Sequence, residues 1–449
     1  MSERESHADE AIYQLPAGLR DWLALERFHL HKIHNYQRLE LDPSFDARYL
    51  PQHCGPFRLP CFLVPRKNLH VFGSQLEDPD GMRFQVDASV DGSIFFPIHP
   101  LALPEYRPFL QQAGGIDAAH DGIHVWAVPT SSTRTLLVWP DGSPESAACV
   151  KTSLNSPVFG DRRVHRFRAA RSVGLSALVA GEREELPRNL QFLSEPLAFT
   201  ARAAPGTGAI IRPIPRDIVG GSVRVVPLFA LLGGEETKRE PLLLTLVERT
   251  STPPVQLLDQ MLCQPFAKLW IELSLRFGWI VESHAQDLLL ELTPQLLPTG
   301  RLYYRDFEGM QVDWELRRRS GRPAPDDLPN AWQWHDSYDT WGARPYCDLT
   351  WYKWSISLIQ FLRAVLHEME LSLQQWHQRG LIGGPACAPG ELTMAFSRHA
   401  FTAIESGFGV SAGTPYNIDR SLNRFLLLLG KLRREIIGTS SARSVEFAA

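Results

Sequence analysis

The sequence predicts an α+β fold, because its two halves show different periodicities. In the first half, short runs of β-branched and aromatic residues alternate with proline and glycine, which is typical of strands joined by turns. From Val255 onward, apolar residues recur at the three- and four-residue spacing of a helix. We therefore expect mixed, mainly antiparallel sheets followed by a helix-rich C-terminal region. The predicted strands are 61–64, 93–96, 123–128, 135–139 and 223–226, and the predicted helices include 257–273 and 354–371.

Length and composition set the scale of this fold. The chain has 449 residues, of which 44% are hydrophobic, so it can form two or three domains or one large domain with lobes. We expect a tail over 1–15, a mixed α+β region over 16–245, a helix-rich region over 246–436 and a second tail over 437–449.

Charge and cysteine usage exclude several classes of protein. A formal net charge of -4 provides no broad basic field for nucleic acid, and we expect the basic run 317–319 to be the solvated face of a loop. The six cysteines form no CxxC pair, which argues against a zinc ribbon or a redox motif and favours reduced thiols. No signal peptide and no membrane-spanning apolar segment are recognisable, so the prediction is a cytoplasmic protein that does not bind membranes.

Two short polar segments in the second half are flanked by apolar runs: Glu282-Ser283-His284-Ala285-Gln286-Asp287 and Arg305-Asp306-Phe307-Glu308-Gly309. We expect them at the ends of a hairpin formed by 287–292 and 301–307. If the first segment is extended, Glu282, His284 and Gln286 share one face. Carboxylates of Glu282 and Asp306, with Asp287 as a further candidate, would suit Mg²⁺ beside a nucleotide triphosphate. The alternative is that Glu282 and His284 pair with each other or cap a turn.

A second polar set in the first half combines cations with hydroxyls. Arg134 follows Ser132, and Lys151 precedes Ser153 and the pair 162–163. Arginine forks and lysine suit a polyphosphate or a polycarboxylate, although such residues are also common on ordinary strand edges. There is no GxxxxGK[ST] loop, and 206–208 is too short and lacks the lysine. Side chains would therefore hold any phosphates.

Taken in order, these segments resemble the NRPS-independent siderophore (NIS) synthetase family, of the aerobactin-synthetase (IucA/IucC-like) type. The motifs that carry the resemblance are Ile98-His99-Pro100, Ser132-Thr133-Arg134-Thr135, Lys151-Thr152-Ser153-Leu154 with Arg163 downstream, and the two polar segments of the second half. The resemblance covers about 28–375, with most of the family's N-terminal thumb-like region lacking. It implies a cupped palm-and-fingers fold whose C-terminal palm holds Mg-ATP. It also implies a ligase that adenylates a citrate-like carboxylate and then joins it to an amine or hydroxyl, releasing AMP and pyrophosphate.

Roles follow from the resemblance residue by residue. It implies that phosphates and substrate carboxylates are held by Ser132, Arg134, Lys151, Ser153 and Arg163, with His99 near the phosphates. His284 would contact the carboxylate substrate or position the acyl-adenylate, Gln286 and Asp287 would line the nucleotide site, and Glu282 with Asp306 would bind Mg²⁺. His284, Arg163 and Lys151 form the implied catalytic set. Homodimerisation is a further expectation from the family.

Four departures from the family pattern bear on activity. Asp287 replaces the usual asparagine, Ala285 replaces glycine, Phe159-Gly160 replaces a Thr-Ser pair, and the early His-Pro-x-x-Lys motif is altered over 28–32. They favour a working ligase with an unusual carboxylate or nucleophile. One alternative is a degenerate, noncatalytic, nucleotide-binding partner of another synthetase. The other is a kinase-like phosphotransferase, since 306–309 resembles a DFG loop, although no glycine-rich loop accompanies it.

Overall fold

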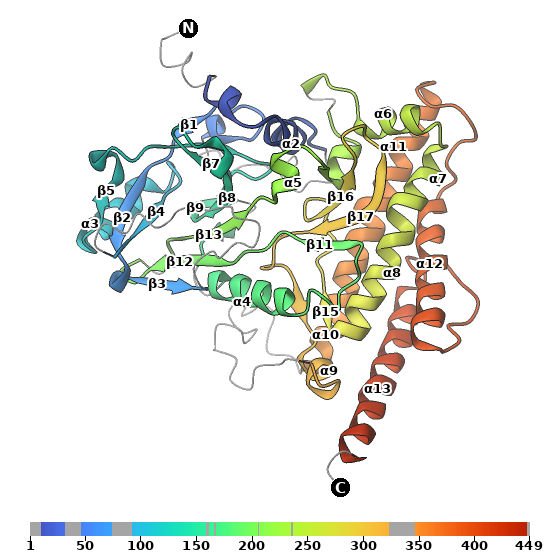
Figure 1. The fold of residues 1–449 in the computed structure, drawn as a ribbon. Coiled ribbons are helices and arrows are strands. Elements are labelled where there is room, and N and C mark those ends of the chain that lie inside the picture. Colours follow the sequence, from blue (N-terminus) through green and yellow to red (C-terminus); the bar gives the residue numbers. More distant parts are fainter. Residues whose placement is uncertain are drawn as a thin grey trace.

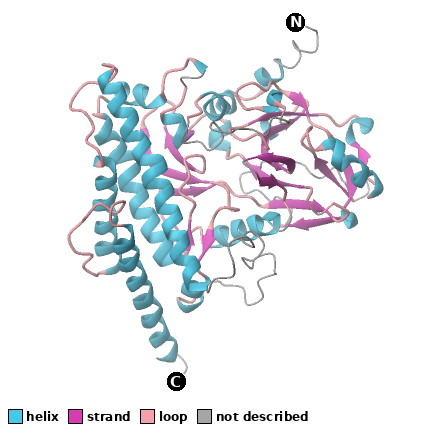
Figure 2. Cartoon of the chain, turned by 180° about the vertical axis from the view of Figure 1, so that it is seen from behind, coloured by secondary structure: helices cyan, strands magenta, loops and turns pink. Residues whose placement is uncertain are grey.

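The computed structural model describes residues 10–31, 46–73, 92–158, 161–165, 168–204, 206–234, 237–322 and 346–446. It has a sheet-rich lobe built from the first half of the chain and a helical lobe built mainly from the second half (Figures 1 and 2). The strands β16 (Leu288–Leu292) and β17 (Pro298–Tyr304) of the second lobe lie on the side that faces the first (Figure 1). The predicted α+β class, with antiparallel sheets first and helices later, is confirmed.

The first lobe is built around a seven-stranded antiparallel sheet. Its strands lie in the order β1 (Phe57–Arg58), β6 (Val125–Pro129), β7 (Thr135–Pro140), β8 (Ala148–Thr152), β13 (Gly208–Pro213), β12 (Leu197–Ala201) and β3 (Leu69–Phe72). A smaller sheet of β4 (Ser93–Pro97), β2 (Cys61–Pro65) and β5 (Ile116–Asp117) packs nearby, beside α3 (Leu103–Gln112). Both sheets contribute apolar side chains to one buried cluster that includes Phe62, Phe96 and Phe199. A two-stranded hairpin, β9 (Leu154–Val158) with β10 (Asp161–Arg163), leads to α4 (Arg168–Gly181).

The second lobe combines a four-stranded sheet with long helices. The sheet order is β11 (Leu190–Phe192), β17 (Pro298–Tyr304), β16 (Leu288–Leu292) and β14 (Arg224–Pro227), with only the β11–β17 pair parallel. The antiparallel β16–β17 pair confirms the predicted hairpin. A short pair, β15 (Trp279–Ile280) with β18 (Gln311–Val312), lies beside it.

The second lobe also contains helices, of which α8 packs on β17 and α12 packs on α8. They are α6 (Leu242–Thr250), α7 (Pro254–Leu258), α8 (Gln264–Glu272), α9 (Trp314–Arg319), α10 (Tyr346–Ile359), α11 (His367–Gln378), α12 (Glu391–Phe408) and α13 (Leu422–Glu446). Pi-helical turns at Asp259–Cys263 and Leu273–Phe277 make α7 and α8 one continuous helical rod, as the 257–273 pattern predicted. The rod ends at Gly278, whose φ of +68° suits glycine and whose Cβ would come 2.8 Å from the Arg317 side chain. α13 projects beyond the other helices (Figure 1).

Three sequence predictions differ from the structure. The first tail ends earlier than residue 15, because Ala11 and Leu15 lie one helical turn apart and are buried against α2 (Ala17–Phe28) and the sheet. The second tail is absent up to Glu446, since α13 continues to that residue. The basic run is not a solvated loop face: it forms α9, where Arg317 is fully buried and pairs with Glu182. Helical geometry turned one member of the run inward.

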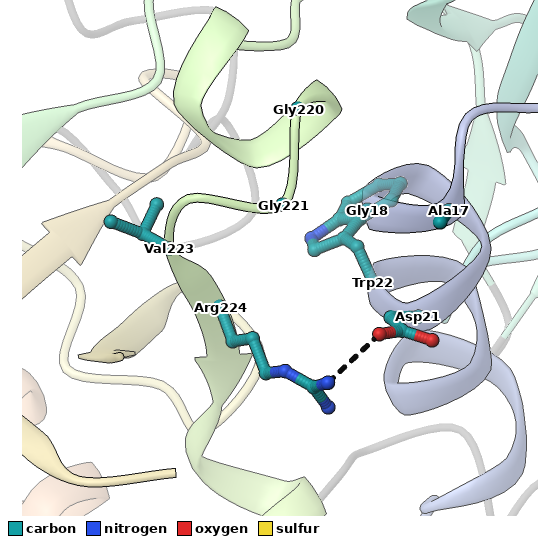
Figure 3. Close-up of a pocket in the computed structure, with 8 residues that line it drawn as sticks. All are labelled: Ala17, Gly18, Asp21, Trp22, Gly220, Gly221, Val223 and Arg224. Carbon is teal, nitrogen blue, oxygen red and sulfur yellow. Dashed lines mark ion pairs between the residues drawn. The ribbon is translucent and has the colours of Figure 1, made fainter. Parts of the chain in front are cut away.

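A small cavity of about 170 Å³ lies where α2 packs on α5 (Arg216–Val219) and β14 (Figure 3). Gly18 permits the close approach, because a Cβ there would come 2.2 Å from the Ile218 carbonyl. An ion pair of 3.0 Å between Asp21 and Arg224 closes one side. None of the predicted site residues lines this cavity, so it is a feature of helix packing.

None of the helices in the described ranges is both long and apolar enough to cross a bilayer.

Candidate functional site

The first-lobe sheet brings Arg134 and Lys151 together. Arg134 lies in the turn between β6 and β7, which Thr130 closes by donating backbone and hydroxyl hydrogen bonds to the Thr135 carbonyl at 2.9 Å each. β7 and β8 pair so that Thr135 lies opposite Lys151. Next to it, Thr152 donates its N–H and its hydroxyl to the Arg134 carbonyl at 2.9 and 3.0 Å. The turn and β8 thus form one rigid unit with two cationic side chains.

The second-lobe hairpin brings the two acidic segments together. Leu288 at the start of β16 lies opposite Tyr304 at the end of β17, so the residues just outside the pair are also neighbours. The Arg305 N–H donates to the Asp287 carbonyl at 3.0 Å. The hairpin therefore delivers Asp287 and Asp306 to the same place.

The prediction that Glu282, His284 and Gln286 share a face of an extended segment is wrong. The His284 N–H donates to the Glu282 carbonyl at 2.8 Å, and the Asp287 N–H donates to the His284 carbonyl at 3.1 Å. The segment is therefore an irregular turn. The side chains do not alternate between two faces as in a strand, because the backbone groups bond to each other and not to a neighbouring strand.

Lys151 joins the two lobes. Its Nζ donates to both carboxylate oxygens of Asp306 at 2.8 Å and to Glu308 Oε2 at 3.0 Å, across 155 residues of sequence. Arg134 also reaches Glu308 Oε2, at 3.4 Å. The Gln286 amide donates to the Ser131 hydroxyl at 3.2 Å, which is a further contact between the lobes. Burial acts to lower the pKa of Lys151, but the carboxylates of Asp306 and Glu308 raise it above its ordinary value.

The carboxyl groups on the acidic side differ in their pKa values. Burial raises the pKa of Glu282, and the nearby Asp306 carboxylate raises it further, although Gln360 donates to Glu282 Oε1 at 3.2 Å. Burial and the charges of Asp306 and Glu282 raise the pKa of Asp287 well above its ordinary value. Asp306 differs: burial acts to raise its pKa, but the Lys151 ammonium brings it below the ordinary value. A further cation would relieve the repulsion among these carboxylates.

Asp306 has a strained backbone. Its φ is +73°, a left-handed conformation that non-glycine residues rarely adopt. The Tyr304 hydroxyl donates to the Asp306 carbonyl at 3.2 Å and accepts from the Glu282 N–H at 3.2 Å. Strain of this kind persists only where the surroundings fix it, and it is frequent at functional sites.

His284 is held as a neutral donor. Its Nδ1 accepts the Gln286 N–H at 3.2 Å, so the ring proton lies on Nε2, which is buried without a partner. Burial lowers the pKa of His284 to about 4, against an opposing effect of Asp306. His99 is also buried, and burial lowers its pKa to about 4. Both imidazoles are therefore neutral at pH 7.

The residues present fit a nucleotide and a metal. Arg134 Nη1 and His284 Nε2 are buried donors without an acceptor, and oxygens of a phosphate or carboxylate would satisfy both. Within the described part of the chain, no group of three or more His, Cys, Asp or Glu side chains is arranged to hold a metal alone. The Glu282 and Asp306 carboxylates suit Mg²⁺, which commonly takes one or two carboxylates and completes its shell with phosphates and water.

Of the other predicted residues, Ser153 is not brought into this group. The Ser153 hydroxyl donates to the Gly206 carbonyl at 2.8 Å and accepts from the Gly208 N–H at 2.9 Å, so it fastens backbone segments to each other. Ser132 is buried in the turn beside Arg134. Arg163 ends β10, but its side chain lies outside the described atoms. The substitution at 159–160 also lies outside the described residues.

Several residues at the site had no role in the sequence prediction. Glu308 bridges Lys151 and Arg134, and its position two residues after Asp306 was a usable signal. Buried His165 contacts the Lys151 carbonyl through Nε2 at 2.7 Å, and burial lowers the pKa of its ring to about 3. Glu26 pairs with Arg305, and nothing in its local sequence distinguishes it from an ordinary helix residue.

The chain is similar to a known protein family and to several solved structures. The model of the IucA / IucC family matches residues 24–233. The petrobactin biosynthesis protein AsbB from Bacillus anthracis str. Sterne is similar with a TM-score of 0.60 and 16% identity, over 95% of this chain and 77% of that chain. The ATP-bound aerobactin synthetase IucA from a hypervirulent pathotype of Klebsiella pneumoniae gives a TM-score of 0.58 and 15% identity, over 90% of this chain and 74% of that chain.

A third solved structure agrees with these two. Aerobactin synthetase IucC from the same Klebsiella pneumoniae pathotype gives a TM-score of 0.54 and 14% identity, over 91% of this chain and 77% of that chain. No curated protein matches the sequence. The chain thus has the fold of the NIS synthetases, and its resemblance to the IucA / IucC family, predicted from its motifs, is confirmed.

Proposed function

We propose that this protein is an ATP-dependent ligase that adenylates a citrate-like carboxylic acid and condenses it with an amine or hydroxyl, in the biosynthesis of a siderophore or a related natural product. The observation that carries the proposal is the hydrogen bonding of Lys151 to Asp306 and Glu308 across the two lobes. It brings a cation that we propose to bind phosphate and a carboxylate that we propose to bind Mg²⁺ to one place. The IucA / IucC family match and the fold of an ATP-bound synthetase support the same chemistry.

The first step joins the acid to AMP. A carboxylate oxygen of the acid attacks the α-phosphorus of ATP, and the bond from that phosphorus to the pyrophosphate oxygen breaks. Negative charge gathers on the phosphate oxygens, where Lys151 and Arg134 stabilise it electrostatically. Mg²⁺ held by Glu282 and Asp306 would neutralise further charge on the phosphates.

The second step transfers the acyl group. The nucleophile attacks the acyl carbon, the bond from that carbon to the AMP oxygen breaks, and the proton of the nucleophile passes to a phosphate oxygen of the departing AMP. Neutral His284 can donate its Nε2–H to an oxygen of the acyl group, since that nitrogen has no acceptor in the protein. Burial of the site keeps water away from the acyl-adenylate, which would otherwise hydrolyse.

Three finer parts of the proposal follow from the sequence. Asp287, Ala285 and Phe159-Gly160 depart from the family pattern, which supports an unusual acid or nucleophile. The cytoplasm, which supplies ATP and keeps thiols reduced, is the proposed location. A homodimer is proposed from the family resemblance, and sedimentation of the purified chain would test it.

The test is ATP–pyrophosphate exchange with purified protein, Mg²⁺ and a panel of di- and tricarboxylic acids. We expect exchange that depends strictly on one acid, and AMP rather than ADP as the product after a nucleophile is added. Tight nucleotide binding without exchange for any acid would instead indicate a noncatalytic partner. Release of ADP would indicate a phosphotransferase and would refute the ligase.

A further inference from the structure

We propose that Glu26 is a positioning residue, which acts through Arg305 to fix the geometry of Asp306. This inference rests on the proposed function, because it assigns Asp306 to the nucleotide and metal site. Glu26 lies on α2, in a part of the sequence to which no site motif extends. It contacts the site only through tertiary structure.

The contact is a buried two-pronged ion pair. Arg305 Nη1 donates to Glu26 Oε1 at 2.6 Å, and Arg305 Nη2 donates to Glu26 Oε2 at 3.1 Å. Glu26 is 0% exposed and Arg305 is 4% exposed. Two parallel hydrogen bonds fix both the distance and the plane of the guanidinium group.

The rest of the Arg305 side chain binds the two site segments. Its Nε donates to the Gln286 carbonyl at 3.0 Å, and Nη2 also reaches the Ser131 hydroxyl at 3.4 Å. Ser131 belongs to the turn that carries Arg134, and Gln286 belongs to the segment that carries His284. The guanidinium of Arg305, the residue that precedes Asp306, therefore links the turn that carries Arg134 to the segment that carries His284.

α2 is itself held firmly, so Glu26 provides a fixed point. Arg27 donates to the carbonyls of Pro51, at 2.8 Å, and Cys54. At the other end of the helix, the Asp21–Arg224 ion pair and the close contact of Gly18 with 218–221 hold α2 against α5 and β14 (Figure 3).

Stability alone is a weak reason for this arrangement. A buried ion pair is often no more stabilising than apolar residues of the same size, because both charges lose their hydration. The strained φ of Asp306 provides the stronger reason, because such a conformation must be imposed by neighbouring contacts. Arg305 is the adjacent residue, and Glu26 determines where its guanidinium lies.

The test compares two buried Arg–Glu pairs of the same chemistry. Glu26→Gln leaves Arg305 buried without its partner charge. The control, Glu182→Gln, does the same to Arg317, which lies outside the site and donates to Glu182 at 2.5 and 3.2 Å. Glu182 also accepts from Trp279 Nε1 at 2.9 Å and pairs with Arg322 at 3.7 Å. We therefore expect both variants to unfold at a lower temperature, Glu182→Gln by at least as much as Glu26→Gln. At saturating substrates, only Glu26→Gln should lower the exchange rate, by about 10- to 100-fold, since small displacements of reacting groups have effects of that size.

A second readout does not require catalysis. Calorimetric titration with ATP at a series of Mg²⁺ concentrations should show that Glu26→Gln needs several-fold more Mg²⁺ for half-maximal binding, while Glu182→Gln matches the wild type. This result would stand even if no acid supported exchange, which would refute the proposed ligase and leave the role of Glu26 intact. Equal Mg²⁺ dependence in all three proteins would overturn the inference.

Glu26→Asp covers the case in which Glu26→Gln does not fold. It keeps the charge but withdraws the carboxylate by one methylene group, so it should fold and still need more Mg²⁺ than the wild type. Full recovery of the wild-type Mg²⁺ dependence would mean that only the charge matters, which contradicts a positioning role.

Discussion

The two sides of the site differ in charge and in how they are built. The first-lobe sheet contributes cations, Lys151 and Arg134, from a regular ladder and its turn. The second lobe contributes carboxylates from irregular segments at the ends of one hairpin, namely Glu282, Asp287, Asp306 and Glu308. Neither set could be buried alone, because unpaired charges in a protein interior are strongly destabilising. The site therefore exists only where the lobes meet.

The two sides also differ in whether their charged groups have partners in the protein. Lys151 lowers the pKa of Asp306, whereas Glu282 and Asp287 retain raised pKa values. Burial is the largest cause of these raised values and the neighbouring carboxylates add to it, so a bound cation would stabilise the charged forms of these groups, which supports the proposed Mg²⁺. The following variants test this comparison.

The largest effect is expected for Lys151→Met. It removes the ammonium group that holds Asp306 and Glu308, so the exchange rate should fall by about 1,000-fold or more. The free energy of unfolding should fall by about 3 kcal/mol, since one partner of a buried ion pair is lost. Denaturant unfolding and ATP–pyrophosphate exchange measure the two effects. Adding Asp306→Asn should restore part of the stability and none of the activity, and recovered activity would contradict the assignment.

Arg134→Ala should have the next largest effect. Its Nη1 is buried without an acceptor, which leaves it available for a phosphate or carboxylate oxygen. We expect exchange to fall by about 100- to 1,000-fold, the usual loss when one preorganised donor is removed. Arg58→Ala is the matched control, because Arg58 lies on the same sheet, pairs with Asp141 at 2.9 Å and is half exposed. If both variants retained wild-type exchange, Arg134 would have no role at the site.

His284→Gln should have a smaller effect on rate and a distinct effect on pH dependence. Glutamine keeps a donor, so we expect exchange to fall by about 10- to 100-fold. Because burial lowers the pKa of His284 to about 4, its protonation should reduce wild-type activity near pH 4 and not near pH 6.5. In the unfolded chain the ring binds its proton near pH 6.5, so its contribution to stability is lost as pH falls from 6.5 to 4.

The measurement for His284 is thermal unfolding of wild type and variant between pH 4 and 7. The difference between their midpoints should change across that window, with the variant showing the flatter profile. If wild-type activity instead fell with a midpoint at pH 6.5, and the variant did not show this fall, the imidazole of His284 would not be desolvated as it is in the structure.

Asp287→Asn should have the smallest effect, and it should be stabilising. The folded pKa of Asp287 is raised, so the folded protein holds a proton that the unfolded chain releases, and wild-type stability falls as pH rises through that window. The variant has no ionisable group at this position, so its stability does not fall with rising pH for this reason. In the presence of a chelator it should melt a few degrees higher at pH 8 and at the wild-type temperature at pH 4. A variant that is less stable than the wild type at pH 8 would contradict the raised pKa of Asp287.

Local patterns predicted some of this fold well. The segment 288–304 has apolar runs at both ends and turn residues between them, so the β16–β17 hairpin could be predicted without knowledge of the rest. The turn at 282–287 could not, because its shape also depends on contacts with distant residues, such as the hydrogen bond from the Glu282 N–H to the Tyr304 hydroxyl at 3.2 Å. The basic run shows a similar limit. Its composition predicts that all three side chains are exposed to solvent, but the position of Glu182 in the fold decides that Arg317 points inward.

The sequence by itself determined the chemistry of the protein: which side chains carry charge, the order of the motifs, and the change from strand to helix periodicity near Val255. Tertiary structure alone decided which of these charged side chains pair with each other. Lys151 meets Asp306, and Glu26 meets Arg305, across 155 and 279 residues. Such contacts leave no local pattern, because a residue's propensities reflect its neighbours in the chain, whereas the stability of a buried charge depends on whichever partner the fold places beside it.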